Sequence, residues 1–394
     1  KRDVSYMRKI PFIMSTQHPD NAFMPDWAGK KFERREEVKE VFYAYSLGCD
    51  EQLWDWEGKE VDSTVVLKLF TKFEAFFKEK ILGRDVFLTY RVPNPEVQRN
   101  DAKALVEALE SIPRNFELAK RFYGKEIAPI FEVAVPMVST SEQLLRVLHF
   151  YEKCVIGKEQ QRVYDISVAE WLGEFKPKTL FIIPLIEDMN SFFNTDTILK
   201  KFINETKRKS LRVWFARSDT ALNYGLVPAE LLLHIGLKKV MEVSSELNVE
   251  LYPILATGSL PFRGFMRPER IDKFIERHKA FWTFGFQSSM KYDFHPLEIR
   301  RSIKKIKSRK RRSSKKFKVR INECEVKRII EIFKADYQNS VRVLAPLVNK
   351  VAKFVPSRRS RVLHIGLFGY SRQLENGIKL PRAIKFTASL YSIG

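Results

Sequence analysis

Short apolar runs alternate with amphipathic stretches along most of the chain. The runs predict eight strands, near residues 10–14, 51–56, 85–90, 128–135, 179–186, 211–216, 249–256 and 281–287. Between them, a helical stripe of Val66, Leu67, Phe70, Phe73 and Phe77 predicts a helix over 63–81, and another is predicted over 142–151. Eight strand-helix units favour right-handed crossovers that close into an α/β fold of the (β/α)8 TIM barrel type.

The last part of the chain has a different pattern. A basic run over 304–320 is typical of a solvated helix end followed by a loop, and residues 322–390 are mostly helical in periodicity. The sequence therefore predicts a catalytic barrel over 1–303, a basic loop over 304–320 and a C-terminal helical region over 321–394 that packs on the barrel.

Composition excludes a disordered chain and indicates a large core. Hydrophobic residues make up 44% and aromatic residues 13% of the 394 positions. No apolar stretch approaches the roughly 20 residues of a membrane-spanning helix, and no cleavable signal is visible, so we expect a cytoplasmic protein without a membrane partner.

The net charge of +22 is compatible with nucleic acid, an anionic membrane or small anionic substrates. The basic run over 304–320 has almost no aromatic residues to stack on bases, which argues against a nucleic-acid partner. Three distant cysteines without CxxC spacing, Cys49, Cys154 and Cys324, predict buried thiols rather than a disulfide or a zinc site.

Two predicted strands end at carboxylates. The run 179–186 is followed by Glu187 and Asp188, and the run 211–216 by Arg217, Ser218 and Asp219. In a barrel, the carboxyl end of a strand points toward the active site, so these acids are candidate metal ligands. The alternative is that Glu187 and Asp219 only cap the helices that follow.

Other polar groups also follow the predicted strands. His18 precedes a proline after the first strand, which suits a general base but is also compatible with a structural histidine. Arg263 lies between Gly258 and Gly264 after the seventh strand, where it could bind an oxyanion bidentately. The remaining candidates are Arg91, Gln287, Arg372 and Arg382. Each arginine alone could be a surface charge, but the set indicates metal-assisted chemistry on an anion.

Five strings resemble archaeal-type phosphoenolpyruvate carboxylase in sequence and order. They are MSTQHPDN at 14–21, ARSDTALNYG at 216–225, ATGSLPFRG at 256–264, FQSSMKYD at 286–293 and LPRAIKFTASLYSIG at 380–394.

The resemblance implies a barrel with additional C-terminal helices, assembled as a homotetramer in its full-length form. It also implies an enzyme that uses Mg²⁺ or Mn²⁺ to join bicarbonate to phosphoenolpyruvate through carboxyphosphate and a metal-bound enolate, giving oxaloacetate and phosphate. By resemblance, the metal ligands are Glu187 and Asp219. The catalytic residues would be His18, Arg263, Arg372 and Arg382, and the substrate-binding residues Arg217, Arg91 and Gln287.

The chain stops at residue 394 where the family continues into further helices, so the resemblance predicts a C-terminally incomplete chain with doubtful activity. Two alternatives stay open at this point. One is another metal-dependent TIM-barrel lyase acting on an enolpyruvate or keto acid. The other is an inactive basic fragment that binds polyanions.

Overall fold

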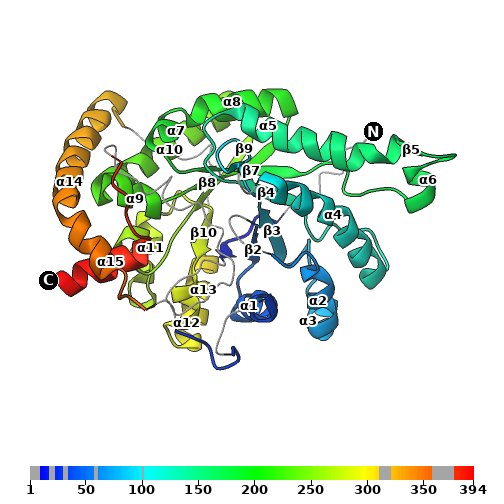
Figure 1. Cartoon of the computed structure of the whole chain (residues 1–394), viewed down its shortest axis with the longest axis horizontal. Coiled ribbons are helices and arrows are strands. Elements are labelled where there is room, and N and C mark those ends of the chain that lie inside the picture. Colours follow the sequence, from blue (N-terminus) through cyan, green and yellow to red (C-terminus); the bar gives the residue numbers. More distant parts are fainter. Residues whose placement is uncertain are drawn as a thin grey trace.

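The centre of the protein is a closed barrel of parallel strands. The computed structural model describes residues 9–16, 23–29, 34–56, 61–99, 102–309, 321–356 and 377–394. Within these residues, eight strands close in the order β1-β10-β9-β8-β7-β4-β3-β2 (Figure 1). They are β1 (Ile13–Ser15), β2 (Glu51–Asp55), β3 (Phe87–Arg91), β4 (Glu132–Val135), β7 (Phe181–Ile186), β8 (Ser210–Phe215), β9 (Glu250–Leu255) and β10 (Thr283–Phe286). Each of the eight predicted runs overlaps one strand, so the predicted α/β barrel is confirmed.

Helices cover the outside of the barrel (Figure 1). They are α1 (Arg34–Leu47), α2 (Val65–Lys72), α3 (Glu74–Glu79), α4 (Ala102–Tyr123), α5 (Ser141–Phe150), α7 (Met189–Phe193), α8 (Thr195–Thr206), α9 (Ser218–Tyr224), α10 (Leu226–Glu246), α11 (Ile271–Arg277), α12 (Ser288–Tyr292) and α13 (Pro296–Ser308). Two further helices, α14 (Glu323–Val351) and α15 (Ala383–Ile393), lie together at one side. None of the helices within the described ranges is long and apolar enough to cross a membrane.

The strands separate two hydrophobic layers, because successive side chains of a strand point to opposite faces. On β8, Trp214 belongs to a cluster inside the barrel with Met14, Leu53 and Ile254. Phe215 belongs to the outer cluster instead and stacks on Phe192 of α7, with ring centroids 5.4 Å apart. The barrel is therefore a filled core rather than a channel.

A charged cluster fills the barrel near the amino ends of its strands. Arg212 of β8, which is 1% exposed, donates to both carboxylate oxygens of Glu51 at 2.7 Å and to Glu132 at 2.9 Å. Burial opposes the charge of Arg212, but the two carboxylates outweigh burial and raise its pKa above the ordinary value. Arg212 is thus buried together with two carboxylates that stabilise its charge.

Two details differ from the sequence-based expectations. The helix predicted over 63–81 divides at Phe73, whose ring stacks on Phe42 with centroids 4.0 Å apart, and Leu67 is 37% exposed rather than part of the buried stripe. The prediction of buried thiols is correct only for Cys49, since Cys154 and Cys324 are exposed.

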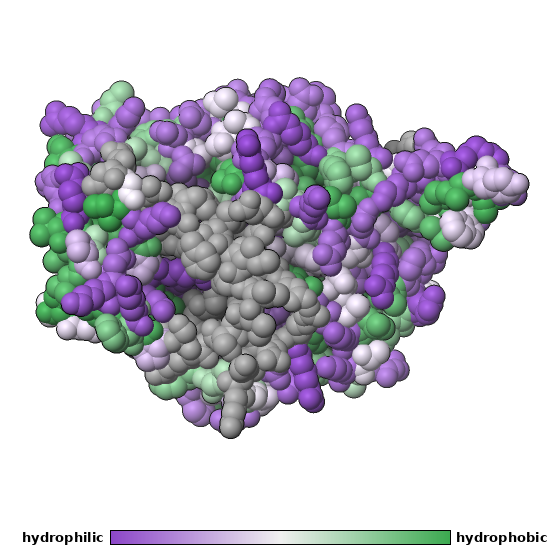
Figure 2. All heavy atoms as spheres, in the orientation of Figure 1, coloured by the Kyte–Doolittle hydropathy of each residue, from purple (hydrophilic) through white to green (hydrophobic). Residues whose placement is uncertain are grey.

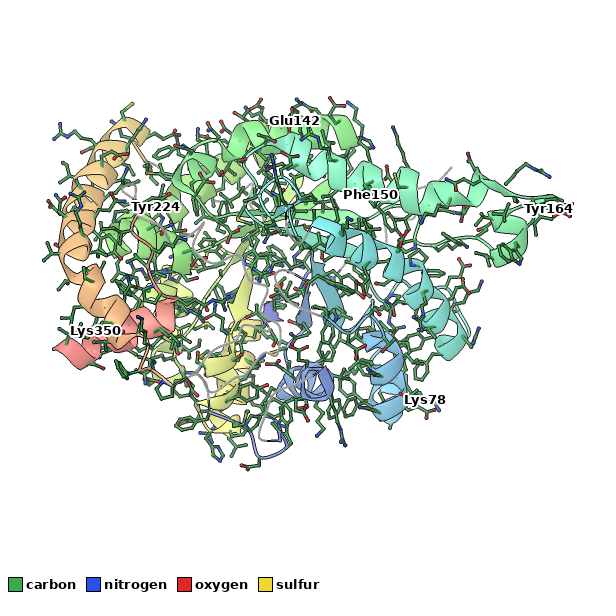
Figure 3. The ribbon with its side chains drawn as sticks, viewed as in Figure 1. Lys78, Glu142, Phe150, Tyr164, Tyr224 and Lys350 are labelled. Atoms are coloured by element: carbon green, nitrogen blue, oxygen red, sulfur yellow. The ribbon has the colours of Figure 1, made fainter. Side chains whose placement is uncertain are left out.

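An arm projects from the barrel between α5 and β7. It consists of the two-stranded sheet β5 (Arg162–Val163) and β6 (Ile166–Ser167) and the helix α6 (Val168–Leu172). Tyr164 lies at the outer tip of the arm and is 98% exposed (Figure 3).

The C-terminal helices pack on α9. Tyr337 of α14 donates from its hydroxyl to the carbonyl of Leu222 at 2.7 Å, next to the α9 end marked by Tyr224 in Figure 3. The opposite side of α14 carries exposed apolar side chains, visible at the edge of the molecule in Figure 2. They are Ile332, Phe333, Val343, Leu344 and Leu347. Within the described residues, α14 and α15 both contact α9, while the predicted division into a barrel, a basic loop and a C-terminal region stays a proposal.

Candidate active site

Glu187 follows β7 directly and its side chain is held by a backbone donor. The N–H of Met137 donates to Glu187 Oε2 at 2.7 Å. Helix α7 is capped by the next residue, Asp188, which accepts from the N–H of Ser191 at 3.0 Å. Helix capping therefore accounts for Asp188 and leaves the position of Glu187 to be explained by another role.

Asp219 lies in the first turn of α9, the helix that follows β8. Strand β8 is the neighbour of β7, the strand that Glu187 follows. The strands β7 and β8 pair in register through Ile186 and Phe215. Thr220, the neighbour of Asp219, donates from Oγ1 to the carbonyl oxygen of Glu187 at 3.0 Å. The residue next to Asp219 is thus tied to the backbone of Glu187 by a hydrogen bond.

The chemistry of this donor set fits Mg²⁺. The ion prefers oxygen ligands and is usually bound by one or two carboxylates, with the remaining positions taken by waters and substrate oxygens. Both acids are partly exposed at the carboxyl ends of the strands. Within the described ranges, no group of three His, Cys, Asp or Glu residues could hold a metal. Glu187 and Asp219 therefore suit an ion that shares its coordination with substrate.

Arg263 and Gln287 meet across the ends of β9 and β10. Arg263 ends the short turn Pro261–Arg263 and donates from Nη1 to Gln287 Oε1 at 2.7 Å. Gly258 makes this contact possible, because a Cβ at that position would lie 2.2 Å from Gln287 Oε1 and 3.0 Å from the Cβ of Arg263. The structure thus brings together two of the predicted site residues.

Arg217 is buried beside the same loop. It is 6% exposed and forms an ion pair through Nη2 with Glu230 Oε2 at 2.7 Å. Burial lowers the pKa of Arg217, partly offset by the charge of Glu230. Gly264, with φ of +96°, allows the Arg217 side chain to pass close to the backbone. One nitrogen of Arg217 is therefore engaged by a protein carboxylate, while Nε and Nη1 have no hydrogen-bond partner among the described residues.

Arg91 occupies the opposite side of the barrel mouth. Its Nε and Nη2 donate to the two carboxylate oxygens of Asp55 at 2.8 and 2.7 Å. Both residues are buried. This bidentate pair satisfies the planar guanidinium with a protein carboxylate, so any substrate anion would compete with Asp55 for Arg91.

Arg382 precedes the first residue of α15, which packs against the loop that carries Arg263. Phe386 of α15 contacts Phe262 edge to face, with ring centroids 5.3 Å apart. Helix α15 also contacts α9, where Asp219 lies. Helix α15, the turn that carries Arg263 and the helix α9 that carries Asp219 therefore pack together. The predicted residues His18 and Arg372 lie outside the described residues.

A buried lysine network supports the end of β1. Lys291, 1% exposed, donates to Ser15 Oγ at 2.8 Å, to the carbonyl of Thr16 at 3.0 Å and to Glu40 Oε1 at 2.8 Å. The partner of Lys291 on α1 was not predicted from the sequence. The only available signal was a lysine inside the FQSSMKYD string.

The fold and this set of groups define a class of protein. Oxygen ligands for a divalent cation and several arginines, gathered at the carboxyl ends of parallel strands, are typical of a barrel enzyme that acts on an anionic substrate.

Comparison with known proteins identifies the family. The sequence profile described as phosphoenolpyruvate carboxylase matches residues 10–394. The chain is 46% identical to the phosphoenolpyruvate carboxylases of Pyrococcus furiosus and Methanothermobacter thermautotrophicus over 98% of its length, covering 81% and 80% of theirs. It is 44% identical to that of Methanospirillum hungatei, with 98% and 80% coverage. The chain therefore belongs to the archaeal-type phosphoenolpyruvate carboxylase family, and the resemblance seen in the sequence is confirmed.

The family also fixes the enzyme class. The activity is that of a phosphoenolpyruvate carboxylase, a carboxy-lyase whose substrates are phosphoenolpyruvate and bicarbonate. Among solved structures, ribulose-1,5-bisphosphate carboxylase/oxygenase from Pyrococcus horikoshii matches with a TM-score of 0.40 and 14% identity, over 76% of this chain and 57% of that chain.

Proposed function

We propose that this chain forms oxaloacetate through a carboxyphosphate intermediate, with Mg²⁺ or Mn²⁺ held by Glu187 and Asp219. The observation that supports the proposal is the hydrogen bond from Thr220, the neighbour of Asp219, to the Glu187 carbonyl, which ties the first turn of α9 to the residue that follows β7. Arg263 and Gln287 lie at the ends of β9 and β10, on the same face of the barrel.

The proposed reaction proceeds in three balanced steps. A bicarbonate oxygen attacks the phosphorus of phosphoenolpyruvate, and the bond between phosphorus and the enol oxygen breaks, leaving pyruvate enolate and carboxyphosphate. Carboxyphosphate then loses its carboxyl proton and its bond between carbon and the bridging oxygen, releasing CO₂ and phosphate. The methylene carbon of the enolate finally forms a bond to CO₂ and gives oxaloacetate. We propose His18 as the group that accepts the carboxyl proton.

Each anionic group in this sequence needs a cationic partner. Arg263, Arg372 and Arg382 are proposed to bind the phosphoryl and carboxylate oxygens, for which the planar guanidinium is well shaped. Arg217 and Arg91 are proposed to contribute to the walls of the substrate site, together with Gln287. A bound divalent cation would neutralise the negative charge that develops on the enol oxygen.

The test is a coupled assay of oxaloacetate with phosphoenolpyruvate, bicarbonate and Mg²⁺ on the Asp219→Asn variant. We expect activity to fall by at least about a hundredfold, because the amide cannot replace the charged oxygen ligand. Asp196→Asn is the matched control, since Asp196 also lies in the first turn of a helix, α8, and is partly buried in an ion pair with Lys239. Full activity of Asp219→Asn would refute the metal assignment.

A second experiment tests the intermediate. In bicarbonate labelled with ¹⁸O, the attacking oxygen stays on phosphorus when carboxyphosphate breaks down. We therefore expect one labelled oxygen in each phosphate released. Unlabelled phosphate would show that CO₂ is added without a carboxyphosphate step.

We further propose a homotetramer in the cytoplasm. The exposed apolar side of α14 supports assembly, because large apolar patches on a protein surface mark interaction sites. Light scattering on the purified chain measures the mass directly, and a monomer at assay concentration would refute the tetramer for this chain.

A further inference from the structure

The backbone turn that holds Glu187 has an unusual conformation. Met137 has φ of +51°, in the left-handed region that residues with a Cβ rarely adopt. It lies just after β4, and the next residue, Val138, returns to the barrel by donating to the carbonyl of Leu185 at 3.1 Å. At this turn the N–H of Met137 does not pair with the backbone of β7. It donates to Glu187 Oε2 instead, at 2.7 Å.

A buried asparagine on the neighbouring strand connection holds this turn in place. Asn94 is 1% exposed and follows β3. Its Nδ2 donates to the carbonyl oxygens of Pro136 at 3.0 Å and of Met137 at 3.4 Å. Both partners are acceptors only, so they require the amide nitrogen and fix the orientation of the side chain.

Asn94 is itself fixed from its own segment. Its backbone N–H donates to Gln98 Oε1 at 2.6 Å, and Gln98 is 0% exposed. Its Oδ1 accepts from the N–H of Glu96 at 3.2 Å. The side chain thus bridges a rigid turn after β3 and the left-handed residue after β4.

We infer that Asn94 is a positioning residue for the metal ligand Glu187, acting through the Pro136–Met137 turn. The inference rests on the proposed role of Glu187 and extends it to a residue in the connection that follows a third strand, β3. A carboxylate that must bind a metal in one orientation needs its second oxygen held by a donor, and the N–H of Met137 supplies that donor only while the turn keeps its left-handed form.

The test is a calorimetric titration of the metal-free chain with MnCl₂, which measures metal binding without turnover. Asn94→Asp keeps the shape and the oxygen that accepts from Glu96, but it loses both donors to the turn. We expect its Mn²⁺ affinity to fall about tenfold, as is usual for loss of an outer-shell contact. Asn115→Asp is the matched control, because Asn115 of α4 is equally buried and its amide also donates to two oxygens, the Tyr90 hydroxyl and the Ser111 carbonyl. We expect the control to bind Mn²⁺ within about twofold of the parent chain.

Asp219→Asn distinguishes failure of the proposed metal site from failure of the proposed role of Asn94. If it binds Mn²⁺ as tightly as the parent chain, the proposed metal site is wrong. If it loses binding while Asn94→Asp matches Asn115→Asp, only the positioning role of Asn94 is refuted.

A second pair of variants covers the case in which Asn94→Asp does not fold. Met137→Gly adopts the positive φ without strain and keeps the N–H donor, so it should keep the Mn²⁺ affinity of the parent chain. Met137→Val places a β-branched side chain where φ is positive and should weaken binding by shifting the turn. Equal affinities of these two variants would overturn the inference.

Discussion

Arg263 donates to Gln287 at 2.7 Å across the ends of β9 and β10, at the carboxyl face of the barrel. Gln287 is 4% exposed and is a neutral acceptor. Gln287 therefore orients the guanidinium without adding a negative charge of its own, which suits a group proposed to bind an anionic substrate.

Gln287→Glu tests whether this neutrality matters. A carboxylate in the same place would neutralise Arg263 and compete with the substrate anion. We expect the KM for phosphoenolpyruvate to rise about tenfold, equivalent to about 1.4 kcal/mol of binding, with a smaller change in kcat. Steady-state kinetics on both substrates measures the effect. Gln143→Glu is the control for added charge, because glutamate can replace glutamine in the capping box of α5. An unchanged KM in Gln287→Glu would contradict a role for Arg263 in binding phosphoenolpyruvate.

Gly258→Ala tests the close packing of Gly258 against Arg263 and Gln287. The new methyl group would lie 2.2 Å from Gln287 Oε1, so either the side chain or the loop must move. We expect a loss of about 1–3 kcal/mol in the free energy of unfolding, together with a higher KM for phosphoenolpyruvate. Urea unfolding and kinetics measure the two effects. Gly157→Ala is the matched control, since its Cβ would meet only Glu152 O at an ordinary 3.5 Å. Equal behaviour of both variants would show that the loop relaxes at no cost.

The fold could be predicted because a strand that is buried on both faces appears in the sequence as a continuous apolar run. Each apolar run is as long as a barrel strand, and the connections between the runs have helical periodicity. The break at Phe73 could not be predicted in the same way. The stripe over 63–81 is continuous in sequence, and only the position of Phe42 on another helix decides where the chain bends.

The site could be predicted only for residues next to a strand end. Glu187, Asp219, Arg263 and Gln287 were predicted by this rule; the structure places them after β7, β8, β9 and β10, and their roles stay proposals. The partners of charged residues depend on barrel closure, which brings together strands distant in sequence. Arg212, for example, meets Glu51 across 161 residues, and no local pattern encodes that contact.

Arg212→Met tests the charged cluster inside the barrel. Removing the arginine leaves Glu51 and Glu132 buried without their shared cation, and a buried pair broken in this way usually costs about 3–5 kcal/mol. We expect a loss of that size in the free energy of unfolding, measured by urea denaturation. The double variant Arg212→Met with Glu51→Gln should recover part of the loss, because one buried charge is removed.

Lys200→Met is the control for the arginine variant. Lys200 pairs with Glu246 on the surface, where both side chains are substantially exposed and water screens the attraction, so the pair contributes little to stability. If Arg212→Met were no more damaging than Lys200→Met, the cluster would not be a stability determinant of the barrel.

The buried His278 should make the protein less stable as the pH falls from about 6.5 to 5. Burial lowers the pKa of His278 to about 3, only partly opposed by the charge of Glu230, so the folded state keeps this ring neutral while the unfolded state takes up a proton near pH 6.5. Over this interval the folded state should lose roughly 1.5 kcal/mol relative to the unfolded state. In His278→Phe, whose new ring fits between Phe274 and Phe281, the loss should be smaller by that amount, as measured by urea unfolding at several pH values. His149→Phe, changed at a side chain that is 55% exposed, should follow the parent chain. Parallel pH curves for the parent chain and His278→Phe would show that another group controls the loss, because Glu230 is present in both.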